Sequence, residues 1–201
     1  MMDYKREVEQ IRVLHVLGTL NLGGTETRIM ELYRNIDRSK IQFDFAIHTV
    51  RDCFYCDEAR KMGANIYLFP KFGLINYFEY KKKWVDFFRD HRDISIVHGH
   101  MTTTAFIYLR IAKRFNNIKK RIAHARNSKK GNVIKYYLAK LSKYYATDLF
   151  AVSKKAAKSE FGYQVTAKSV KIVPNYINLD KFHFSDKNRQ VIRKRFSMGE
   201  E

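Results

Sequence analysis

Histidines lie in or at the ends of several short apolar runs of this chain, where an imidazole can ligate a metal, contact a substrate hydroxyl or cap a helix. His15 lies within the first run, later runs end at His48, His98 and His124, and His100 follows two residues after His98. The spacing of His98 and His100 suits a metal, but their segment contains no carboxylate. We therefore predict no metal site and favour contacts with a substrate or helix caps, with buried structural histidines as the alternative.

A glycine-rich stretch follows the first apolar run, with Gly18, Gly23 and Gly24 ahead of Thr25 and Glu26 at the start of a predicted helix. Glycines there let backbone N–H groups approach a phosphate or a sugar, and a helix N-terminus favours an anion. The spacing is not G-x-G-x-x-G and lacks the Lys-Ser/Thr ending of a P-loop. It therefore indicates neither a standard dinucleotide site nor a nucleoside triphosphatase, and a tight turn that packs a helix on a sheet is the alternative.

Arg126 and Asn127 directly follow the run that ends at His124. Arginine suits bidentate contact with a phosphate, although a solvated loop is the alternative. The carboxyl ends of parallel strands face one ligand crevice, so we expect these residues to share that crevice with His100. The residues that we predict to bind substrate or donor are Gly23, Gly24, Glu26, Arg126 and Asn127.

Two segments, 76–89 and 129–145, combine basic and aromatic residues. In the first, Trp84 and its aromatic neighbours fall near one helix face beside a lysine run, which is typical of an interfacial helix on anionic lipid. Nucleic acid is a competing partner, and core-facing aromatics with a solvated basic face are a second alternative. The residues predicted to meet a membrane surface are Lys81, Lys82, Lys83 and Trp84.

The elements that must position these residues alternate between short apolar runs and longer segments of helical period, which predicts an α/β fold with crossover helices on a parallel sheet. We expect a Rossmann-like, doubly wound sheet of about seven strands with helices on both faces. The predicted strands are 11–17, 43–48, 65–69, 94–98, 120–124, 148–151 and 171–173. The predicted helices are 24–36, 75–89, 103–115, 133–145, 154–161, with Ser153 as N-cap, and 186–196.

Composition describes a globular chain of 201 residues with 45% hydrophobic residues and a formal charge of +19, which attracts polyanions such as nucleic acid, anionic lipid or phosphorylated ligands. Its apolar runs are too short to span a bilayer, and its N-terminus lacks the apolar stretch of a signal peptide. We expect a cytoplasmic location, peripheral on the inner face of the membrane. Cys53 and Cys56 cannot form a disulfide framework, and we interpret their spacing as incidental rather than as a redox or metal site.

Five segments, taken together, resemble the amino-terminal half of family-4 GT-B glycosyltransferases. The nearest subgroup is that of bacterial enzymes of exopolysaccharide or capsular polysaccharide assembly. The resemblance covers residues 11 to about 196. The segments are HVLGTLNLGGTETR, SIVHGHMTTTAF, RIAHARNS, TDLFAVSKKAAKSEFG and VKIVPNYINLDKF.

The resemblance implies retaining transfer of a sugar from a UDP- or GDP-linked donor to a lipid-linked or oligosaccharide acceptor, without a further cofactor. It places His100 at the donor sugar as the catalytic residue, Gly23 and Gly24 near the donor phosphates and acceptor, and Arg126 and Asn127 beside the acceptor pocket. Basic nucleic-acid binding and a stand-alone Rossmann-type ligand-binding domain are the alternatives, and the charge is the sole support for nucleic acid.

The resemblance also implies that residues 1–185 form the acceptor-side domain and that residues 186–201 begin the connection to a carboxyl-terminal donor-binding domain. The E-x7-E motif of that second domain is absent from this sequence, so we expect little or no transfer by this chain alone. The turn at 174–178, P-N-Y-I-N, departs from the P-N-G-I-D common in the family.

Overall fold

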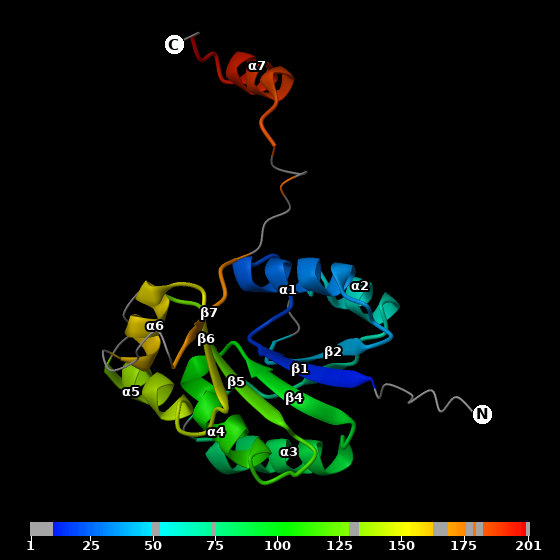
Figure 1. Cartoon of the computed structure of the whole chain (residues 1–201), viewed down its shortest axis with the longest axis vertical. Coiled ribbons are helices and arrows are strands. Elements are labelled where there is room, and N and C mark those ends of the chain that lie inside the picture. Colours follow the sequence, from blue (N-terminus) through cyan, green and yellow to red (C-terminus); the bar gives the residue numbers. More distant parts are fainter. Residues whose placement is uncertain are drawn as a thin grey trace, which may run out of the picture.

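A parallel sheet of seven strands in the order β3-β2-β1-β4-β5-β6-β7 organises the chain (Figure 1). This computed structural model describes residues 10–49, 53–73, 75–128, 133–162, 169–175, 179 and 183–199. The strands are β1 (Ile11–Leu17), β2 (Ile41–Ile47), β3 (Ile66–Leu68), β4 (Ile94–Gly99), β5 (Lys120–Ala125), β6 (Asp148–Ala151) and β7 (Lys171–Ile172). The helices are α1 (Gly24–Asn35), α2 (Cys56–Lys61), α3 (Tyr77–Asp90), α4 (Thr102–Ala112), α5 (Val133–Ser142), α6 (Lys154–Phe161) and α7 (Asp186–Arg195).

The predicted α/β class and strand number are confirmed. Each predicted strand lies within two residues of its observed bounds, because most of these strands contain short apolar runs that are easy to delimit. Ser153 caps α6 as predicted, with its hydroxyl accepting the Ala156 N–H at 3.1 Å. The altered turn at 174–178 lies largely outside the described residues, which omit 176–178.

Two hydrophobic clusters cover opposite faces of the sheet. Along β1 the side chains alternate, so that Val13 and Leu17 join one cluster while Leu14 and Val16 join the other. The first cluster packs under α1 and α2, and the second packs against α3, α4 and α6 (Figure 1). The chain order reverses at β1, which pairs with β2 on one side and β4 on the other, so the loops at the carboxyl ends of β1 and β4 diverge and leave a crevice.

Helix α3 corrects the prediction that Trp84 meets a membrane. Tyr80, Trp84 and Phe88 are each 0% exposed, and the Trp84 ring stacks on Phe69 with their centroids 3.8 Å apart. These aromatics recur at intervals of four residues, so one face of the helix carries them all, and that face covers the sheet. Lys82 and Lys83 lie on the exposed face, as the alternative of core-facing aromatics with a solvated basic face predicted.

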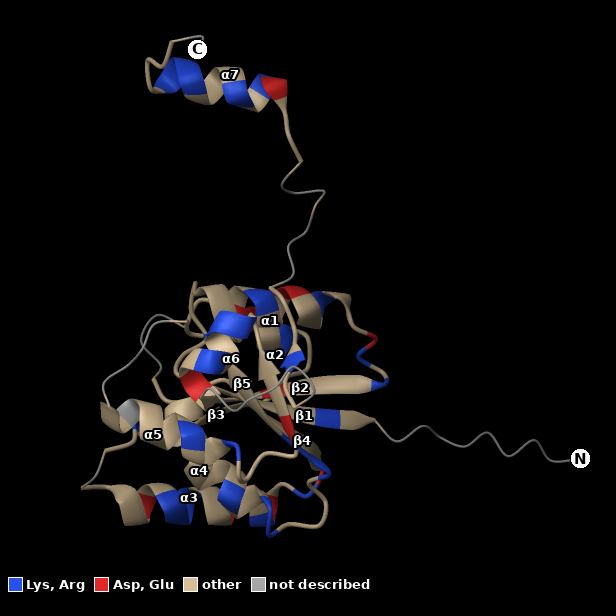
Figure 2. Ribbon diagram, turned by 60° about the vertical axis from the view of Figure 1, so that its left-hand side comes forward, with Lys and Arg blue, Asp and Glu red and all other residues tan. Residues whose placement is uncertain are grey.

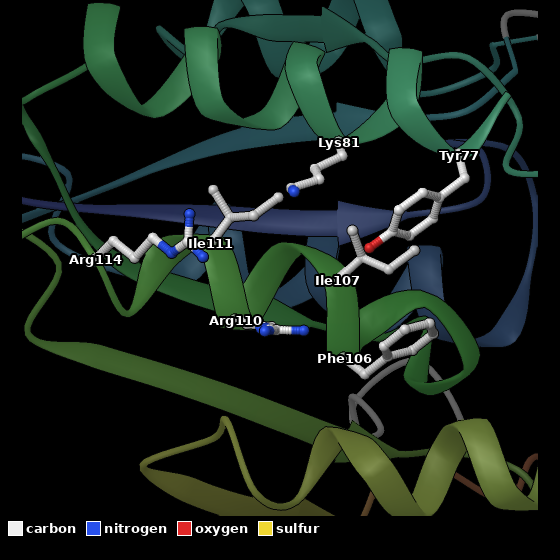
Figure 3. A pocket seen from close by; sticks show the side chains of 7 residues that line it. All are labelled: Tyr77, Lys81, Phe106, Ile107, Arg110, Ile111 and Arg114. Atoms are coloured by element: carbon white, nitrogen blue, oxygen red, sulfur yellow. The ribbon is translucent and has the colours of Figure 1, made fainter.

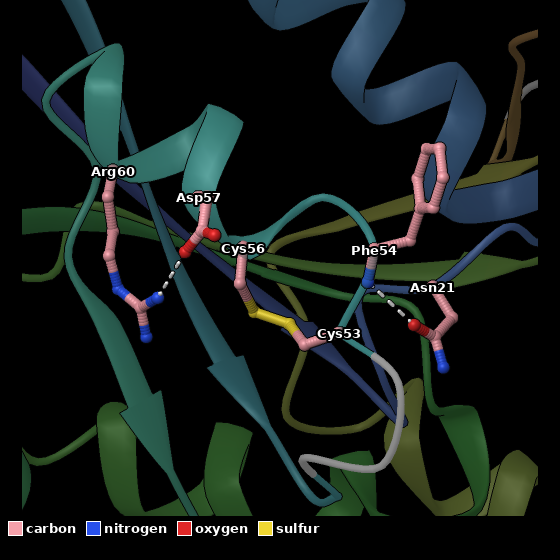
Figure 4. Close-up of a disulfide and its surroundings, with 6 residues drawn as sticks. All are labelled: Asn21, Cys53, Phe54, Cys56, Asp57 and Arg60. Carbon is pink, nitrogen blue, oxygen red and sulfur yellow. Dashed lines mark hydrogen bonds and ion pairs between the residues drawn. A yellow bond between two sulfur atoms is a disulfide. The ribbon is translucent and has the colours of Figure 1, made fainter.

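A short helix and a disulfide were missed by the sequence analysis. A disulfide joins Cys53 to Cys56, the first residue of α2, where a turn brings their Cα atoms to 5.4 Å (Figure 4). The interpretation that their spacing marks neither a redox nor a metal site stays a prediction. The same turn contacts the glycine-rich loop, because the Phe54 N–H donates to Asn21 Oδ1 at 2.8 Å and the Tyr55 N–H donates to the Leu20 carbonyl at 3.0 Å. The turn therefore anchors the segment that leads into α1.

Helix α7 begins at Asp186 and is capped by Ser185, whose hydroxyl accepts the Asn188 N–H at 3.3 Å, and the helix buries none of its residues. Its start coincides with the predicted boundary at 185/186, and the assignment of 186–201 to an interdomain connection stays a prediction. Every helix within the described ranges is too short or too polar to pass through a bilayer.

Because Trp84 is buried, we expect Trp84→Ala to lower the free energy of unfolding by about 3–5 kcal/mol, measured by urea denaturation. Trp84 is the single tryptophan, so intrinsic fluorescence reports its surroundings directly. Its emission should be blue-shifted and should not change when anionic liposomes are added. An emission shift on liposome binding would show that the ring leaves the core.

Candidate functional site

Four histidines converge on the sheet face that carries α1, near the carboxyl ends of the central strands. His15 comes from β1, His98 from β4, His124 from β5, and His100 follows β4 directly. We call these residues the imidazole cluster. They line a pocket of about 450 Å³ that also involves one side of α1, Phe150 on β6 and the segment after β7. His15 and His124 are each 2% exposed, whereas His98 and His100 are partly buried.

Hydrogen bonds give His100 a defined proton arrangement. Arg126 Nε donates to His100 Nδ1 at 3.1 Å, and His100 Nε2 lies 3.0 Å from His15 Nδ1. A guanidinium N–H can only donate, so His100 Nδ1 carries its lone pair and its proton resides on Nε2. His100 Nε2 therefore donates to His15 Nδ1, and the remaining His15 proton is on Nε2. Both ring nitrogens of His100 are thus occupied by protein partners.

The remaining nitrogens of the cluster include two that the protein leaves unpaired. His98 Nε2 and His124 Nδ1 lie 3.0 Å apart, while the buried Nε2 atoms of His15 and His124 have no hydrogen-bond partner. A buried polar atom without a partner costs free energy. His15 and His124 both line the pocket, but these two nitrogen atoms are themselves shielded from it.

Burial keeps the imidazoles uncharged and leaves arginine as the main charge of the pocket. Desolvation, followed by the positive charge of Arg126, lowers the pKa of His98 to about 3 and that of His124 to about 2. Desolvation also lowers the pKa values of His15 and His100 well below the usual range. Burial lowers the pKa of Arg126 to about 10, and Glu26 opposes this shift, so the guanidinium remains charged at neutral pH. The pocket therefore offers the Arg126 guanidinium beside several neutral hydrogen-bonding groups, and α1 adds Arg28 and Glu31 to its lining. The guanidinium suits contact with a phosphorylated sugar.

Some of the predicted site residues come together and others do not line this pocket. His100 and Arg126 are in contact and both line it, and Glu26 is close enough to Arg126 to affect its charge. Gly23 is the N-cap of α1, and a Cβ atom there would collide with the Glu26 carboxylate, which folds back over it. Gly24 begins α1 and is exposed, and the Asn127 side chain is also exposed. The functional roles of these six residues stay predictions.

Other pocket residues were missed by the sequence analysis. Asn175 Oδ1 accepts a hydrogen bond from Arg126 Nη1 at 3.4 Å. The Phe150 ring lies beside the rings of His98 and His124. The analysis also missed Glu160, which lies on α6 outside the lining of this pocket and accepts hydrogen bonds from the loop after β5. A charged residue at an apolar position of α6 is the one sequence signal that could have indicated Glu160.

His15, His98 and His100 form the one group among the described residues that could gather around a metal ion, with ligand nitrogens within 4.8 Å of one another. Zinc needs Zn–N distances of about 2.0–2.1 Å, so these rings would have to move closer together. The Arg126 guanidinium already contacts His100 and would repel a cation. We therefore assign no metal to the cluster.

A doubly wound parallel sheet with a charged, polar pocket beside its switch point defines the class of Rossmann-like domains that bind ligands at strand carboxyl ends. Within that class, the chain belongs to glycosyltransferase family 4, whose family model matches residues 22–181. A curated relative, the putative glycosyltransferase EpsF of Bacillus subtilis (strain 168), is 32% identical over 182 residues. That alignment covers 86% of this chain and 47% of EpsF, so the chain spans about half the length of this relative.

Solved structures show the same fold at low sequence identity. Anabaena Alr3699/HepE in complex with UDP-glucose matches with a TM-score of 0.68 at 12% identity, covering 94% of this chain and 50% of HepE. A glycosyltransferase from Rickettsia africae ESF-5 matches with a TM-score of 0.67 at 15% identity, covering 96% of this chain and 51% of that protein. These structures confirm the predicted GT-B-type architecture of the domain.

The neutral imidazoles make stability depend on pH. Their folded-state pKa values lie below the unfolded value of about 6.5, so only the unfolded chain gains protons as the pH falls through that value. We expect the free energy of unfolding to drop between pH 7.5 and 5.5 by about 1.4 kcal/mol for each buried imidazole, and to keep falling toward pH 3. Urea denaturation across this range measures the loss. His124→Gln should show a shallower dependence, and equal slopes for the variant and the native chain would contradict this account.

Proposed function

We propose that this chain is the acceptor-side domain of a retaining hexosyltransferase that moves a sugar from a nucleotide-sugar to a growing, lipid-linked polysaccharide. Membership of family 4 supports the transferase class, and the similarity to EpsF supports a role in exopolysaccharide assembly. In this proposal the donor-binding half belongs to a longer protein, and the present chain alone has little activity.

The observation that carries the proposal is the contact between His100 and Arg126 at the mouth of the sheet crevice. Arg126 supplies a buried positive charge that can attract a phosphorylated group, and His100 presents an uncharged ring beside it. Donor sugar hydroxyls can reach His100 by replacing the hydrogen bond to His15 or to Arg126. His100 then acts as a hydrogen-bonding group at the reacting sugar rather than as an acid or a base.

A UDP- or GDP-linked sugar is the proposed donor, and no further cofactor is needed. HepE, which shares the fold, was solved with UDP, with UDP and glucose, and with UDP-glucose. A uridine or guanosine diphosphate is a good leaving group that also brings negative charge to the cationic side of the crevice.

In the full-length protein, His100→Ala should lower kcat for sugar transfer by about 100-fold, as expected for loss of a hydrogen-bonding group at the reacting centre. The measurement is transfer of radiolabelled sugar from UDP- or GDP-linked donors to lipid extracts. The exposed Lys155→Ala on α6 is the control and should match the native rate. An unchanged kcat in His100→Ala, with an unchanged melting temperature, would remove His100 from the catalytic role.

The proposed acceptor is lipid-linked, and the molecule has a surface that suits an anionic membrane. Basic residues are spread over α1, α3, α6 and α7 (Figure 2), and one groove between α3 and α4 combines them with apolar residues (Figure 3). Its described lining includes no acidic residue. The residues that line this α3/α4 groove are Tyr77, Lys81, Phe106, Ile107, Arg110, Ile111 and Arg114.

Exposed apolar side chains on α3 and α5 replace Trp84 as the groups that could enter a lipid surface. Phe78 at the start of α3 is 79% exposed, and Ile134 on α5 is 68% exposed. Lys82 pairs with Asp86 at 2.6 Å, so its charge is partly neutralised and it contributes less than Lys81. Each basic residue near an anionic leaflet adds up to about 1 kcal/mol to binding.

Liposome co-sedimentation tests this surface. The triple change Lys81→Glu, Arg110→Glu and Arg114→Glu should reduce binding to anionic vesicles at least tenfold, whereas Lys82→Glu should have a smaller effect. Binding should grow with the anionic lipid fraction and weaken with salt. Indifference to anionic vesicles together with tight binding to single- or double-stranded DNA at physiological salt would contradict the membrane role and favour nucleic acid.

A further inference from the structure

Glu160 is a buried carboxylate that the proposed chemistry does not use. It lies on α6 beside Ala156, Ala157 and Phe161, which are buried, and it is itself only 8% exposed. An ionised carboxylate at such a position is costly unless hydrogen bonds replace its water. The identity of its partners therefore indicates what the residue does.

The Glu160 carboxylate accepts three hydrogen bonds. Oε1 accepts the backbone N–H of Asn127 at 2.7 Å and that of Arg126 at 3.1 Å. Oε2 accepts the hydroxyl of Thr102. Burial raises the pKa of Glu160, and these three hydrogen bonds act in the opposite direction because they favour the ionised form.

These partners lie in or directly beside the two loops that carry the candidate site. Thr102 begins α4, two residues after His100, and Arg126 and Asn127 directly follow β5. The side chains of His100 and Arg126 meet across the gap between these loops at 3.1 Å. One carboxylate thus joins both loops, and the helix that carries it, α6, packs against the core through Ala156, Ala157 and Phe161.

We propose that Glu160 is a positioning residue, which holds the loops after β4 and β5 at the spacing that lets Arg126 contact His100. The inference rests on the proposed function for its effect on catalysis, and on the hydrogen bonds alone for its effect on the loops. Without this acceptor, two backbone N–H groups lose their partner and the loop after β5 can move away from His100.

The side-chain chemistry of glutamine offers a conservative replacement. In Glu160→Gln, the amide oxygen still accepts both backbone N–H groups, and the amide nitrogen can donate to the Thr102 hydroxyl oxygen. Glu160→Ala removes all three contacts, and Thr102→Val removes only the one to the loop after β4. The exposed Lys155→Ala lies on the same helix and is the matched control.

Hydrogen exchange in the full-length protein tests the loops without reference to catalysis. In peptides that span residues 120–128, the amides of Arg126 and Asn127 should exchange at least about tenfold faster in Glu160→Ala than in the native protein. Glu160→Gln and Lys155→Ala should stay within about threefold of native exchange. Equal exchange in Glu160→Ala and the native protein would overturn the proposal.

Kinetics test the consequence for transfer. Glu160→Ala should lower kcat by about 10- to 100-fold while the donor KM changes less than about threefold, and Glu160→Gln should restore most of kcat. If Glu160→Ala does not fold, Thr102→Val should show a smaller loss of kcat. A lower melting temperature in Glu160→Ala with native kcat at a temperature where it is folded would show a merely structural role and overturn the proposal.

The outcomes also separate the two proposals. If the native full-length protein transfers no sugar from any UDP- or GDP-linked donor, the proposed function fails, and the exchange of Arg126 and Asn127 still decides whether Glu160 holds the loops. If transfer occurs and Glu160→Ala leaves both exchange and kcat unchanged, the role of Glu160 fails alone.

Discussion

The pairing of β1 with β2 on one side and β4 on the other is the constraint on which the site depends. Crossovers between parallel strands are almost always right-handed, so reversing the strand order at β1 sends α1 and α2 to one face of the sheet and the later helices to the other. The first hydrophobic cluster packs under α1 and α2. Beside it, on the same face of the sheet, strands β4 to β6 carry His98, His124 and Phe150. The pocket is therefore a direct result of the strand order.

The fold could be predicted because sheet strands buried on both faces leave an unmistakable pattern, as in the run from Ile11 to Leu17. The meeting of His100 and Arg126 could be predicted from their places just after parallel strands. The orientation of Trp84 could not, because periodicity places aromatics on one face of α3 without showing which face meets the sheet. Packing decides that, since Trp84 covers Phe69 and the exposed face is left to lysines.

Glu160 and the Cys53–Cys56 pair escaped prediction for a different reason. Glu160 depends on hydrogen bonds to residues 33 and 34 positions earlier in the chain, which the local pattern does not encode. The cysteine pair lies in a turn whose Phe54 N–H donates to the Asn21 side chain, 33 residues earlier. Hydrophobic periodicity describes how an element meets the core, whereas single polar side chains that join loops become visible only in three dimensions.

The chain of hydrogen bonds from Arg126 through His100 to His15 limits what His100 can do. One ring nitrogen accepts a hydrogen bond from Arg126 and the other donates to His15, so in this arrangement His100 has no spare lone pair with which to remove a proton from a hydroxyl. The guanidinium beside it further disfavours an imidazolium. In the proposed reaction, the proton of the acceptor hydroxyl is therefore removed by the departing diphosphate oxygen or by a group outside this cluster, and the fixed ring of His100 positions the donor sugar instead.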